Sequence, residues 1–395
     1  MPSIENTQVG VLGAGAMGSG IAQVAATAGH PVMVVDAKES AIEKARKGVH
    51  KSLARDVEKG RITAEQAKAV EQRIRFATTA GNDYSVFREC QVVIEAIVEH
   101  LETKRNAFKA IEPVVSEGCV LATNTSSLSV AAIAAACKFP TRVIGLHFFN
   151  PATVLPLVEV VGAIASDRSV VERARGLVTR WGKVTVTARD TPGFIVNRVA
   201  RPFYGEALRI YEEGIADVAT IDWALKELGG FKMGPFELMD LIGNDVNYAV
   251  TRSVFEGLYY DPRYRPSVTQ RRMVEAGLLG RKTQVGFYDY RAGAPKPQPD
   301  SERQLGTKIF DRVLAMLINE AAEAVLFKIA SADDIDLAMT KGVNYPKGLL
   351  AWADDIGIPK VYERLVALQD EYGDDRYRPS ALLKRMARDG KRFYP

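Results

Sequence analysis

The chain has 395 residues, of which 47% are hydrophobic and 25% are charged, as in ordinary globular proteins. This length exceeds the usual size of a single hydrophobic core, so two or three domains are expected. The formal net charge of +4 is too small over such a length to indicate affinity for nucleic acid or for membranes, so any basic binding site must be local.

The cysteines and the N-terminus indicate the compartment. Cys90, Cys119 and Cys137 are far apart and lack CxxC spacing, so they are expected to be buried or incidental thiols, without a structural zinc or disulfide framework. Residues 1–8 are polar and lead directly into an apolar run, without the pattern of a secretory signal. No apolar stretch approaches the roughly 20 residues that span a bilayer. The expected location is the cytoplasm or an organelle interior.

Apolar runs that are typical of buried strands alternate with helical segments in the first half of the chain. QVGVLG, a glycine turn, the small-residue helix GSGIAQVAATAG and PVMVVD form a βαβ unit within about 30 residues. Further apolar runs occur near residues 91–97, 119–124 and 142–149, whereas residues 41–73 form a long, charged helical stretch. This rhythm predicts an α/β Rossmann-type doubly wound domain over residues 1–190.

The second half of the chain is expected to be all-α and duplicated. Long amphipathic helical segments follow over residues 191–290, and RAGAPKPQPDSE, with three prolines, predicts a linker. Residues 206–243 laid over residues 320–357 without a gap give eleven identities in 38 positions. Two repeated all-α domains are therefore expected, the second over residues 300–395.

A GxGxxG pattern follows the first expected strand and begins a helix. It consists of Gly13, Ala14, Gly15, Ala16, Met17 and Gly18. Gly13 permits a tight turn, Gly15 lets a pyrophosphate approach the backbone at the helix N-terminus, and Gly18 lets the helix pack closely. Asp36 ends the next strand, where a carboxylate hydrogen-bonds a ribose 2′-hydroxyl and repels a 2′-phosphate, so NAD is predicted. A plain tight turn and a helix cap remain the alternatives.

His147 lies at the end of the apolar run VIGLHFF, before an Asn-Pro turn. Ligands of open parallel sheets lie beyond the carboxyl ends of the strands, and an imidazole there suits proton transfer near neutral pH. Glu159, inside the apolar run LPLVEVV, needs a partner if it is buried, and His147 is the natural candidate. A lone histidine on an apolar strand is more often structural, so Glu159 is what favours a catalytic pair.

Two further features leave alternatives open. Asn124-Thr125-Ser126-Ser127 ends another expected strand and is either the cap of the next helix or a ligand contact. A basic face of roughly 120° in the charged stretch either holds the phosphates of an extended anion or is merely solvated. This face consists of Lys44, Lys47, Lys51, Arg55 and Lys59.

Together these motifs resemble the 3-hydroxyacyl-CoA dehydrogenase family, and its 3-hydroxybutyryl-CoA type in particular. GAGAMG, VVD, VIEAIVE, NTSSL, HFFNP, VEVV, DTPGFIVNR and GRKTQVGFYDY occur in the order of the family over residues 9–290. The resemblance implies a Rossmann domain for NAD, a helical domain that completes the cleft, and reversible oxidation of an L-3-hydroxyacyl-CoA to the 3-oxoacyl-CoA, without a metal.

The resemblance also implies roles for single residues. His147 matches the catalytic base and Glu159 its carboxylate partner, Ser126 matches the contact of substrate hydroxyl and nicotinamide, and Asn197 matches the asparagine beside the reacting oxygen. Ser52 and Lys59 match CoA-contacting positions less securely. Cofactor contacts are implied at Gly13, Gly15, Ala16, Met17, Gly18, Asp36, Glu99, Lys104 and Asn150.

The second helical copy departs from the short family form. It lacks the GPFELMD of the first copy and has no NTSS or HFFNP companion, so a second active site is not expected. The helical domain is the dimerisation element of the short form, and we expect residues 305–395 to pack against residues 195–290 in place of a dimer partner; a homo-oligomer is the alternative. For the function, the alternatives are a same-fold dehydrogenase of a free sugar acid, a non-catalytic dinucleotide-binding protein and one module of a larger β-oxidation assembly.

Overall fold

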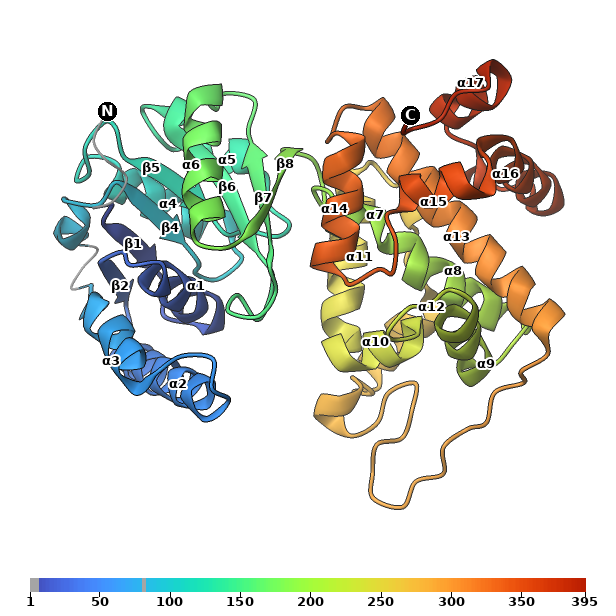
Figure 1. Cartoon of the computed structure of the whole chain (residues 1–395), viewed down its shortest axis with the longest axis horizontal. Helices are drawn as coiled ribbons and strands as arrows, with labels where there is room; N and C mark the ends of the chain where they lie inside the picture. Colours follow the sequence, from blue (N-terminus) through green and yellow to red (C-terminus); the bar gives the residue numbers. More distant parts are fainter. Residues whose placement is uncertain (1–6, 80–82) are drawn as a thin grey trace. The chain divides into compact units, whose positions relative to one another are not determined.

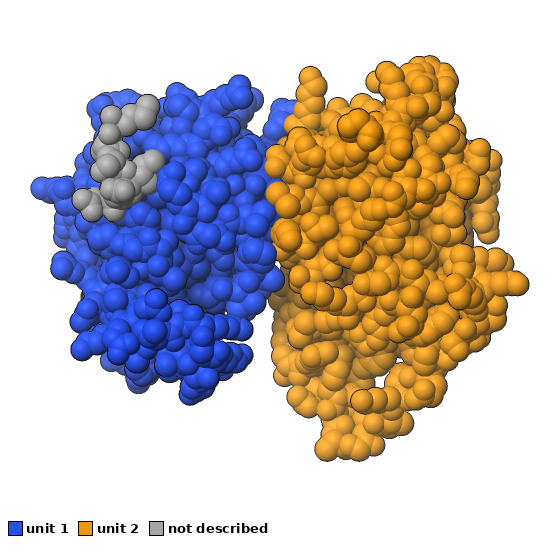
Figure 2. All heavy atoms as spheres, viewed as in Figure 1, with its two compact units in different colours: residues 1–191 blue, residues 192–395 orange. Residues whose placement is uncertain are grey.

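The computed structural model describes residues 7–79 and 83–395, and the chain divides into two compact units, residues 1–191 and residues 192–395 (Figure 2). The predicted separation into helical domains at 191–290 and 300–395 stays a prediction, because the second unit contains both. Each unit is described by itself.

The first unit contains one eight-stranded sheet, with the strand order β3-β2-β1-β4-β5-β6-β7-β8 (Figure 1). All neighbouring strands are parallel except β6 and β7, which pair antiparallel. The strands are β1 (Val9–Leu12), β2 (Val32–Asp36), β3 (Ile74–Thr78), β4 (Val92–Glu95), β5 (Val120–Thr123), β6 (Val143–Phe148), β7 (Leu157–Gly162) and β8 (Val184–Arg189). The chain reverses its direction of winding at β1, so the loops that follow β1 and β4 lie side by side at the carboxyl edge of the sheet.

Helices cover both faces of this sheet. Val9 and Val11 share one core cluster with Ile21 and Leu177. The alternate residue Gly10 faces the other side, where an added Cβ would meet Phe87. The helices are α1 (Ala16–Thr27), α2 (Glu39–Glu58), α3 (Ala64–Arg73), α4 (Leu101–Ile111), α5 (Val130–Ala134) and α6 (Arg168–Arg180). The predicted doubly wound α/β fold is confirmed.

Three strands and one helical stretch of this unit differ from the sequence-based expectation. The five predicted strands form, but β3, β7 and β8 were not predicted. The charged stretch 41–73 is two helices, because Gly60 takes a left-handed φ of 66° and Thr63 begins α3 with a capping box to Gln66. α2 and α3 therefore turn back on each other beside the sheet.

The second unit is helical. Its helices are α7 (Val196–Val199), α8 (Arg201–Glu212), α9 (Val218–Trp223), the π-helical η4 (Ala224–Leu228), α10 (Pro235–Ile242), α11 (Asn244–Gly257), α12 (Val268–Glu275), α13 (Arg303–Leu326), α14 (Ala332–Gly342), α15 (Leu349–Ile356), α16 (Ile358–Tyr372) and α17 (Ala381–Asp389). The predicted linker, residues 291–302, is an extended loop before α13 (Figure 1). Among the residues that the structure describes, no helix is long and apolar enough to cross a membrane.

The duplicated sequence positions have the same structural role in both copies. Asp222 accepts two backbone hydrogen bonds of 2.9 Å from the first turn of α10, and Asp336 accepts the same pair from the first turn of α15. Gly234 and Gly348 precede these helices, and a Cβ at either would lie within 2.3 Å of the aspartate carboxyl group. The expectation that the copies share one helical packing is therefore confirmed at these positions.

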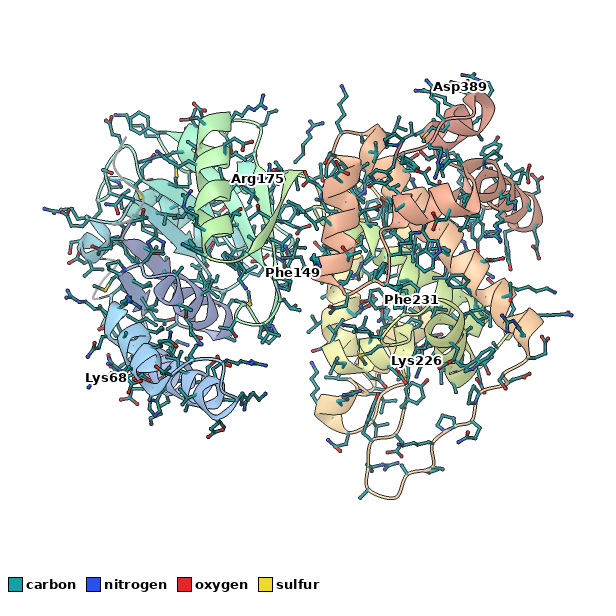
Figure 3. The ribbon with its side chains drawn as sticks, in the orientation of Figure 1. Lys68, Phe149, Arg175, Lys226, Phe231 and Asp389 are labelled. Atoms are coloured by element: carbon teal, nitrogen blue, oxygen red, sulfur yellow. The ribbon has the colours of Figure 1, made fainter. Side chains whose placement is uncertain are left out.

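The two copies are packed into each other. α8 of the first copy lies along α13 of the second. Phe231 (Figure 3) meets Tyr345 edge to face and stacks on Trp352, with ring centroids 4.9 and 6.0 Å away. Aromatic side chains thus form a core that belongs to both copies. Residues 305–395 pack against residues 195–290, as expected.

Two buried ion pairs cross between the copies in opposite directions. The Arg198 Nε donates to Glu320 Oε1 at 2.6 Å, and the Arg312 Nε donates to Glu206 Oε2 at 3.1 Å. The two arginines are 114 positions apart, as are the two glutamates. Each copy therefore gives the other the same arginine and the same glutamate, which is the reciprocity of a twofold contact.

Candidate active site

The three glycines of the GxGxxG loop are required for three different reasons. Gly13 has a φ of 108°, and a Cβ there would lie 2.5 Å from the carbonyl oxygen of Ala96 after β4. A Cβ on Gly18 would lie 1.8 Å from the Gly13 carbonyl oxygen, so α1 packs directly on the loop. A Cβ on Gly15 would meet nothing within 4 Å. Open space above Gly15, at the N-terminus of α1, is the cradle that a pyrophosphate needs.

Asp36 links the end of β2 to this loop. Its carboxylate accepts hydrogen bonds from the backbone N–H of Ala14 at 2.8 Å and of Lys38 at 2.9 Å. The side chain is half-buried, and each oxygen retains a second lone pair. The residues of the loop and Asp36 fit the diphosphate and the adenosine ribose of a dinucleotide.

His147 and Glu159 lie directly opposite each other in the antiparallel pairing of β6 with β7. The His147 Nδ1 and the Glu159 Oε2 are 2.6 Å apart, and the two side chains are 7% and 0% exposed. A carboxylate at Nδ1 fixes the orientation of the ring, as is typical of a histidine that acts as an acid or base through Nε2. The predicted pair is thus brought together by strand register.

The NTSS segment after β5 is anchored by Glu99 and does not cap a helix. The Glu99 Oε1 accepts hydrogen bonds from the Thr125 hydroxyl at 2.5 Å and from the backbone N–H of Ser126 and Ser127 at 3.1 and 3.2 Å. Ser129 caps α5. The helix-cap alternative is wrong, because the segment turns toward β4 before the helix begins.

Ser126 combines a fixed backbone with an uncommitted side chain. Its hydroxyl makes no hydrogen bond to any of the residues that the structure describes, and the side chain is half-buried. Phe148 donates its backbone N–H to the Asn124 Oδ1 at 2.9 Å, which joins the NTSS segment to the strand of His147. The hydroxyl is therefore held on a rigid loop at the same edge of the sheet.

Lys104 is a buried cation below this loop. Its side chain is 1% exposed, and its ammonium lies 2.6 Å from the Glu95 Oε1 and 3.1 Å from the Glu99 Oε2. Burial acts to raise the pKa of Glu99, but Lys104 and the hydroxyl donors outweigh it and hold that pKa below its usual range. Glu99 thus stays charged. Whether Glu99 and Lys104 contact a cofactor directly stays a prediction.

Glu95 is a site residue that the sequence analysis missed. It ends β4 with 1% exposure and accepts hydrogen bonds from Lys104, from the Thr123 hydroxyl at 2.7 Å and from the Ile97 N–H at 2.7 Å. The sequence contained a signal for Glu95. An acidic residue at the end of an apolar run needs a buried partner, by the same argument that was applied to Glu159.

The segment after β6 carries Phe149 and Asn150. The ring of Phe149 (Figure 3) lies 4.5 Å from the ring of His147, between centroids, and tilts over it. Asn150 follows as an exposed residue in the next loop. Its predicted contact at the nicotinamide end stays a prediction.

The basic face of α2 is exposed on the surface of the first unit. All five of its residues are exposed, and none forms an ion pair within the described part of the chain. The opposite side of α2 packs on the sheet through Ile42, Ala45, Val49 and Leu53. Ser52 and Lys59 are seven residues apart, so they lie on one side of the helix, the first half-buried and the second exposed. The binding of an anion by this face stays a prediction.

Asn197 belongs to the other compact unit, where it lies in the one-turn helix α7. Its side chain is half-buried, and its carbonyl oxygen accepts a 2.8 Å hydrogen bond from the Arg201 Nε. Its place beside a reacting oxygen stays a prediction.

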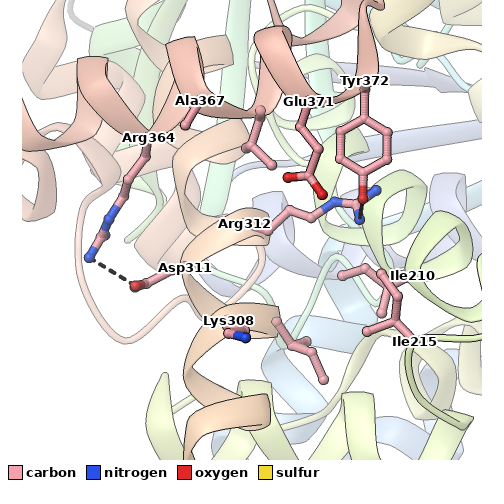
Figure 4. A pocket seen from close by; sticks show the side chains of 11 residues that line it. Ile210, Ile215, Lys308, Asp311, Arg312, Arg364, Ala367, Glu371 and Tyr372 are labelled. Atoms are coloured by element: carbon pink, nitrogen blue, oxygen red, sulfur yellow. Dashed lines mark hydrogen bonds and ion pairs between the residues drawn. The ribbon is translucent and has the colours of Figure 1, made fainter.

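A separate pocket of about 340 Å³ lies in the helical unit, between α8, α13 and α16 (Figure 4). None of the predicted site residues lines it. Its wall includes Asp311, 114 positions after Asn197, and the Asp311 Oδ2 pairs with the Arg364 Nη2 at 2.9 Å. The second copy thus has a neutralised carboxylate where the first has the predicted asparagine.

The cysteines are free, and the expectation of buried thiols is confirmed for Cys90 and Cys119. Burial raises the pKa of each cysteine thiol, Cys137 included, to about 12, so these are poor nucleophiles near neutral pH. No three His, Cys, Asp or Glu side chains come together as metal ligands in the described ranges.

Comparison with known proteins gives a family match over nearly the whole chain. The family model for the NAD binding domain of 3-hydroxyacyl-CoA dehydrogenase matches residues 8–191. The model for the C-terminal domain of that enzyme matches residues 193–290 and 309–392. Each helical copy is therefore covered by the same model.

Curated relatives and solved structures agree. The chain is 38% identical to a 3-hydroxyadipyl-CoA dehydrogenase of Escherichia coli over 96% of this chain and 97% of the relative. It is 40% identical to a 3-hydroxybutyryl-CoA dehydrogenase of Bradyrhizobium diazoefficiens, over 73% and 97%. A crystal structure of 3-hydroxybutyryl-CoA dehydrogenase from Escherichia coli superposes with a TM-score of 0.91 at 37% identity, covering 97% of this chain and 98% of that one.

Proposed function

The chain belongs to the 3-hydroxyacyl-CoA dehydrogenase family and carries out NAD-dependent oxidation of 3-hydroxyacyl-CoA, and from that premise we propose which residues perform the reaction and which acyl group is oxidised. The observation that carries the assignment is the buried pair of His147 and Glu159, 2.6 Å apart across β6 and β7.

His147 is the general base. Its Nε2 takes the proton of the 3-hydroxyl group, and the carboxylate of Glu159 at Nδ1 stabilises the imidazolium that forms. NAD, held by the GxGxxG loop and Asp36, would supply the redox chemistry as the acceptor of the hydride from C3. Because Glu159 has no exposed surface, the charge that it offers to His147 is little screened by water.

Ser126 and Asn197 are the proposed donors to the reacting oxygen. The Ser126 hydroxyl is free of other described partners on a loop fixed by Glu99, so it keeps its position without reorganisation during the reaction. Glu99 and Lys104 support the loop from below, and the nicotinamide end of the cofactor lies at this loop and at Asn150 in this proposal.

Asp36 sets the cofactor preference. We expect kcat/KM to be at least about tenfold higher with NAD than with NADP, because a 2′-phosphate beside this carboxylate is a like-charge contact. Asp36→Asn should narrow that ratio, since it removes the charge and keeps one acceptor for the loop. Glu39→Gln, an exposed change three residues later, should leave the ratio as it is. Equal kcat/KM for both cofactors in the unaltered enzyme would count against this role.

The acyl group is proposed to be short, as in 3-hydroxybutyryl-CoA. The support is the similarity to the 3-hydroxybutyryl-CoA dehydrogenases, while the relative that matches the chain over its full length is named for 3-hydroxyadipyl-CoA, a longer dicarboxylic substrate. Assays of NADH formation and consumption with acetoacetyl-CoA, longer 3-oxoacyl-CoAs, a dicarboxylic 3-oxoacyl-CoA and free 3-hydroxy acids decide between them. Faster turnover of free hydroxy acids would favour the alternative, a same-fold dehydrogenase of a sugar acid.

The basic face of α2 is the proposed site for the CoA phosphates, together with Ser52. Reversing Lys51, Arg55 and Lys59 to Glu should raise KM for acetoacetyl-CoA about tenfold or more, because several exposed charges attract one phosphate cluster. A truncated pantetheine thioester, which lacks the nucleotide, should keep its KM.

A charge-matched control separates this from a general field effect. Lys68, Arg168 and Arg180 are exposed in the same compact unit, and changing them to Glu alters the net charge equally. This variant should leave both KM values unchanged. If the α2 variant raises KM equally for both substrates, the face is merely solvated.

The second helical copy is proposed to replace a dimer partner. The reciprocal pairs of Arg198 with Glu320 and Arg312 with Glu206 support this, because they reproduce within one chain the exchange that a twofold interface makes between two.

A further inference from the structure

Several contacts hold the backbone around Asn197. The Asn197 carbonyl accepts from Arg201 at 2.8 Å, and the Arg198 N–H donates to the Gly193 carbonyl at 3.1 Å. Gly193 has a φ of 77°, and a Cβ there would lie 2.9 Å from the Arg198 nitrogen. The Arg198 side chain also reaches Glu320. This anchor comes from the second helical copy.

The anchor is buried, and one oxygen of Glu320 accepts two hydrogen bonds. Arg198 and Glu320 expose 6% and 2% of their side chains, and the Tyr264 hydroxyl donates to the same Glu320 oxygen that Arg198 contacts. Arg263 approaches the other oxygen, with its Nη1 3.8 Å from Oε2. Burial acts to lower the pKa of Arg198, but the carboxylate of Glu320 outweighs it and holds that pKa above its ordinary range. The guanidinium therefore stays charged and fixed.

α7 needs such an anchor because it is short. It contains only four residues, Val196–Val199, and one helical turn is not rigid by its own hydrogen bonds. It packs on α13 and α14, both of the second copy. Since Arg198 directly follows Asn197, a rotation of α7 that releases the arginine also moves the asparagine amide.

We propose that Glu320 is a positioning residue for the active site, which holds Asn197 in place through Arg198. This rests on the proposed role of Asn197 at the reacting oxygen. The second helical copy would then act in the reaction and not only in folding, because its Glu320 orients Asn197, a proposed substrate contact of the first copy. Small displacements of such a contact cost up to about 100-fold in rate.

The chain contains a matched control for this proposal. Glu206 of the first copy accepts a hydrogen bond from Arg312 of the second, which is the reciprocal arrangement. The Tyr377 hydroxyl donates to the Glu206 Oε2 at 3.0 Å. Arg312 follows Asp311, which stands where the first copy has Asn197 and pairs with Arg364 (Figure 4).

In both networks a buried carboxylate of one copy accepts hydrogen bonds from an arginine and a tyrosine of the other copy. Arg312 differs from Arg198 in that it also donates to Glu213. Only the network of Glu320 adjoins a predicted reacting group.

The experiment compares Glu320→Gln with Glu206→Gln in the full chain. Both variants should fold with a lower Tm, since each neutralises one carboxylate of a buried ion pair. In Glu206→Gln the arginine keeps its hydrogen bonds to Glu213. Glu320→Gln should lower kcat about tenfold, with KM for NAD unchanged, whereas Glu206→Gln should keep kcat within about twofold. Should Glu320→Gln not fold, Tyr264→Phe and its counterpart Tyr377→Phe remove one hydrogen bond from each carboxylate and repeat the comparison.

A double-mutant cycle with Asn197→Ala separates this proposal from the proposed function. If Glu320 acts through Asn197, the effect of Glu320→Gln on kcat disappears in the Asn197→Ala background. Equal losses of kcat in the Glu320 and Glu206 variants, or additive losses in the cycle, would overturn the positioning role while leaving Asn197 in place. An Asn197→Ala enzyme with normal kcat would instead remove the proposed function of Asn197 itself.

Discussion

His147→Gln is expected to lower kcat by about 10²-fold or more, the range for a positioned acid or base, while the Kd for NAD changes little. Glutamine still donates a hydrogen bond to Glu159 but cannot take the hydroxyl proton. Steady-state kinetics with acetoacetyl-CoA and NADH, together with a fluorescence titration of NADH, measure both quantities. Near-normal turnover across the pH range would remove His147 from the reaction.

His30→Gln is the control for the loss of a buried histidine. His30 is 6% exposed, against 5% for His147, and lies before β2, where its Nδ1 meets the Thr7 carbonyl oxygen at 3.1 Å. His30 therefore lies at the amino end of β2, whereas Asp36 lies at its carboxyl end, on the opposite edge of the sheet. The change should alter Tm and leave kcat unchanged, so a comparable drop in kcat would mean that His147→Gln reports on folding.

The parts of the site that follow a strand in sequence were predictable. Gly13, Asp36, Ser126 and His147 each lie at or just beyond the carboxyl end of a parallel strand, and such ends meet at one edge of the sheet whatever the details of packing. Turn and strand chemistry is local, so a short stretch of sequence is enough to indicate it.

The contact of His147 with Glu159 depends on more than local pattern. The apolar run of β7 indicated burial of Glu159, but only the antiparallel direction of β7 and its register with β6 place residue 159 opposite residue 147. A shift by one residue would turn the carboxylate to the other face. β3 and β8 escaped prediction because their exposed edge residues and threonines weaken the apolar signal.

The contacts between the two helical copies could not be predicted in detail. The repeat showed Glu206 and Glu320 as identical positions, but identity does not reveal that each glutamate binds the arginine of the other copy. Such pairs depend on tertiary packing between segments more than 100 residues apart in sequence. The reciprocal arrangement can be recognised only in the structure, where both ion pairs are present.

The same reciprocity predicts what happens when the second copy is removed. A chain that ends after Tyr290 leaves Arg198 without Glu320 and Glu206 without Arg312, and breaking a buried pair costs about 3–5 kcal/mol. It also exposes Phe231 and the face of α8 that α13 covers, which is a large apolar surface. We expect this protein to aggregate or to associate through the uncovered face, and light scattering measures either result.

Adding the missing part back provides the control for this truncation. Co-expression of residues 300–395 as a separate chain should restore a soluble particle of the original mass, because the buried pairs and the aromatic core re-form between the two fragments. If the shortened chain is instead a stable monomer with unchanged kcat, the second copy is an appended module. In that case neither its role as an internal partner nor the positioning role of Glu320 can stand, since both require that the first copy depend on the second.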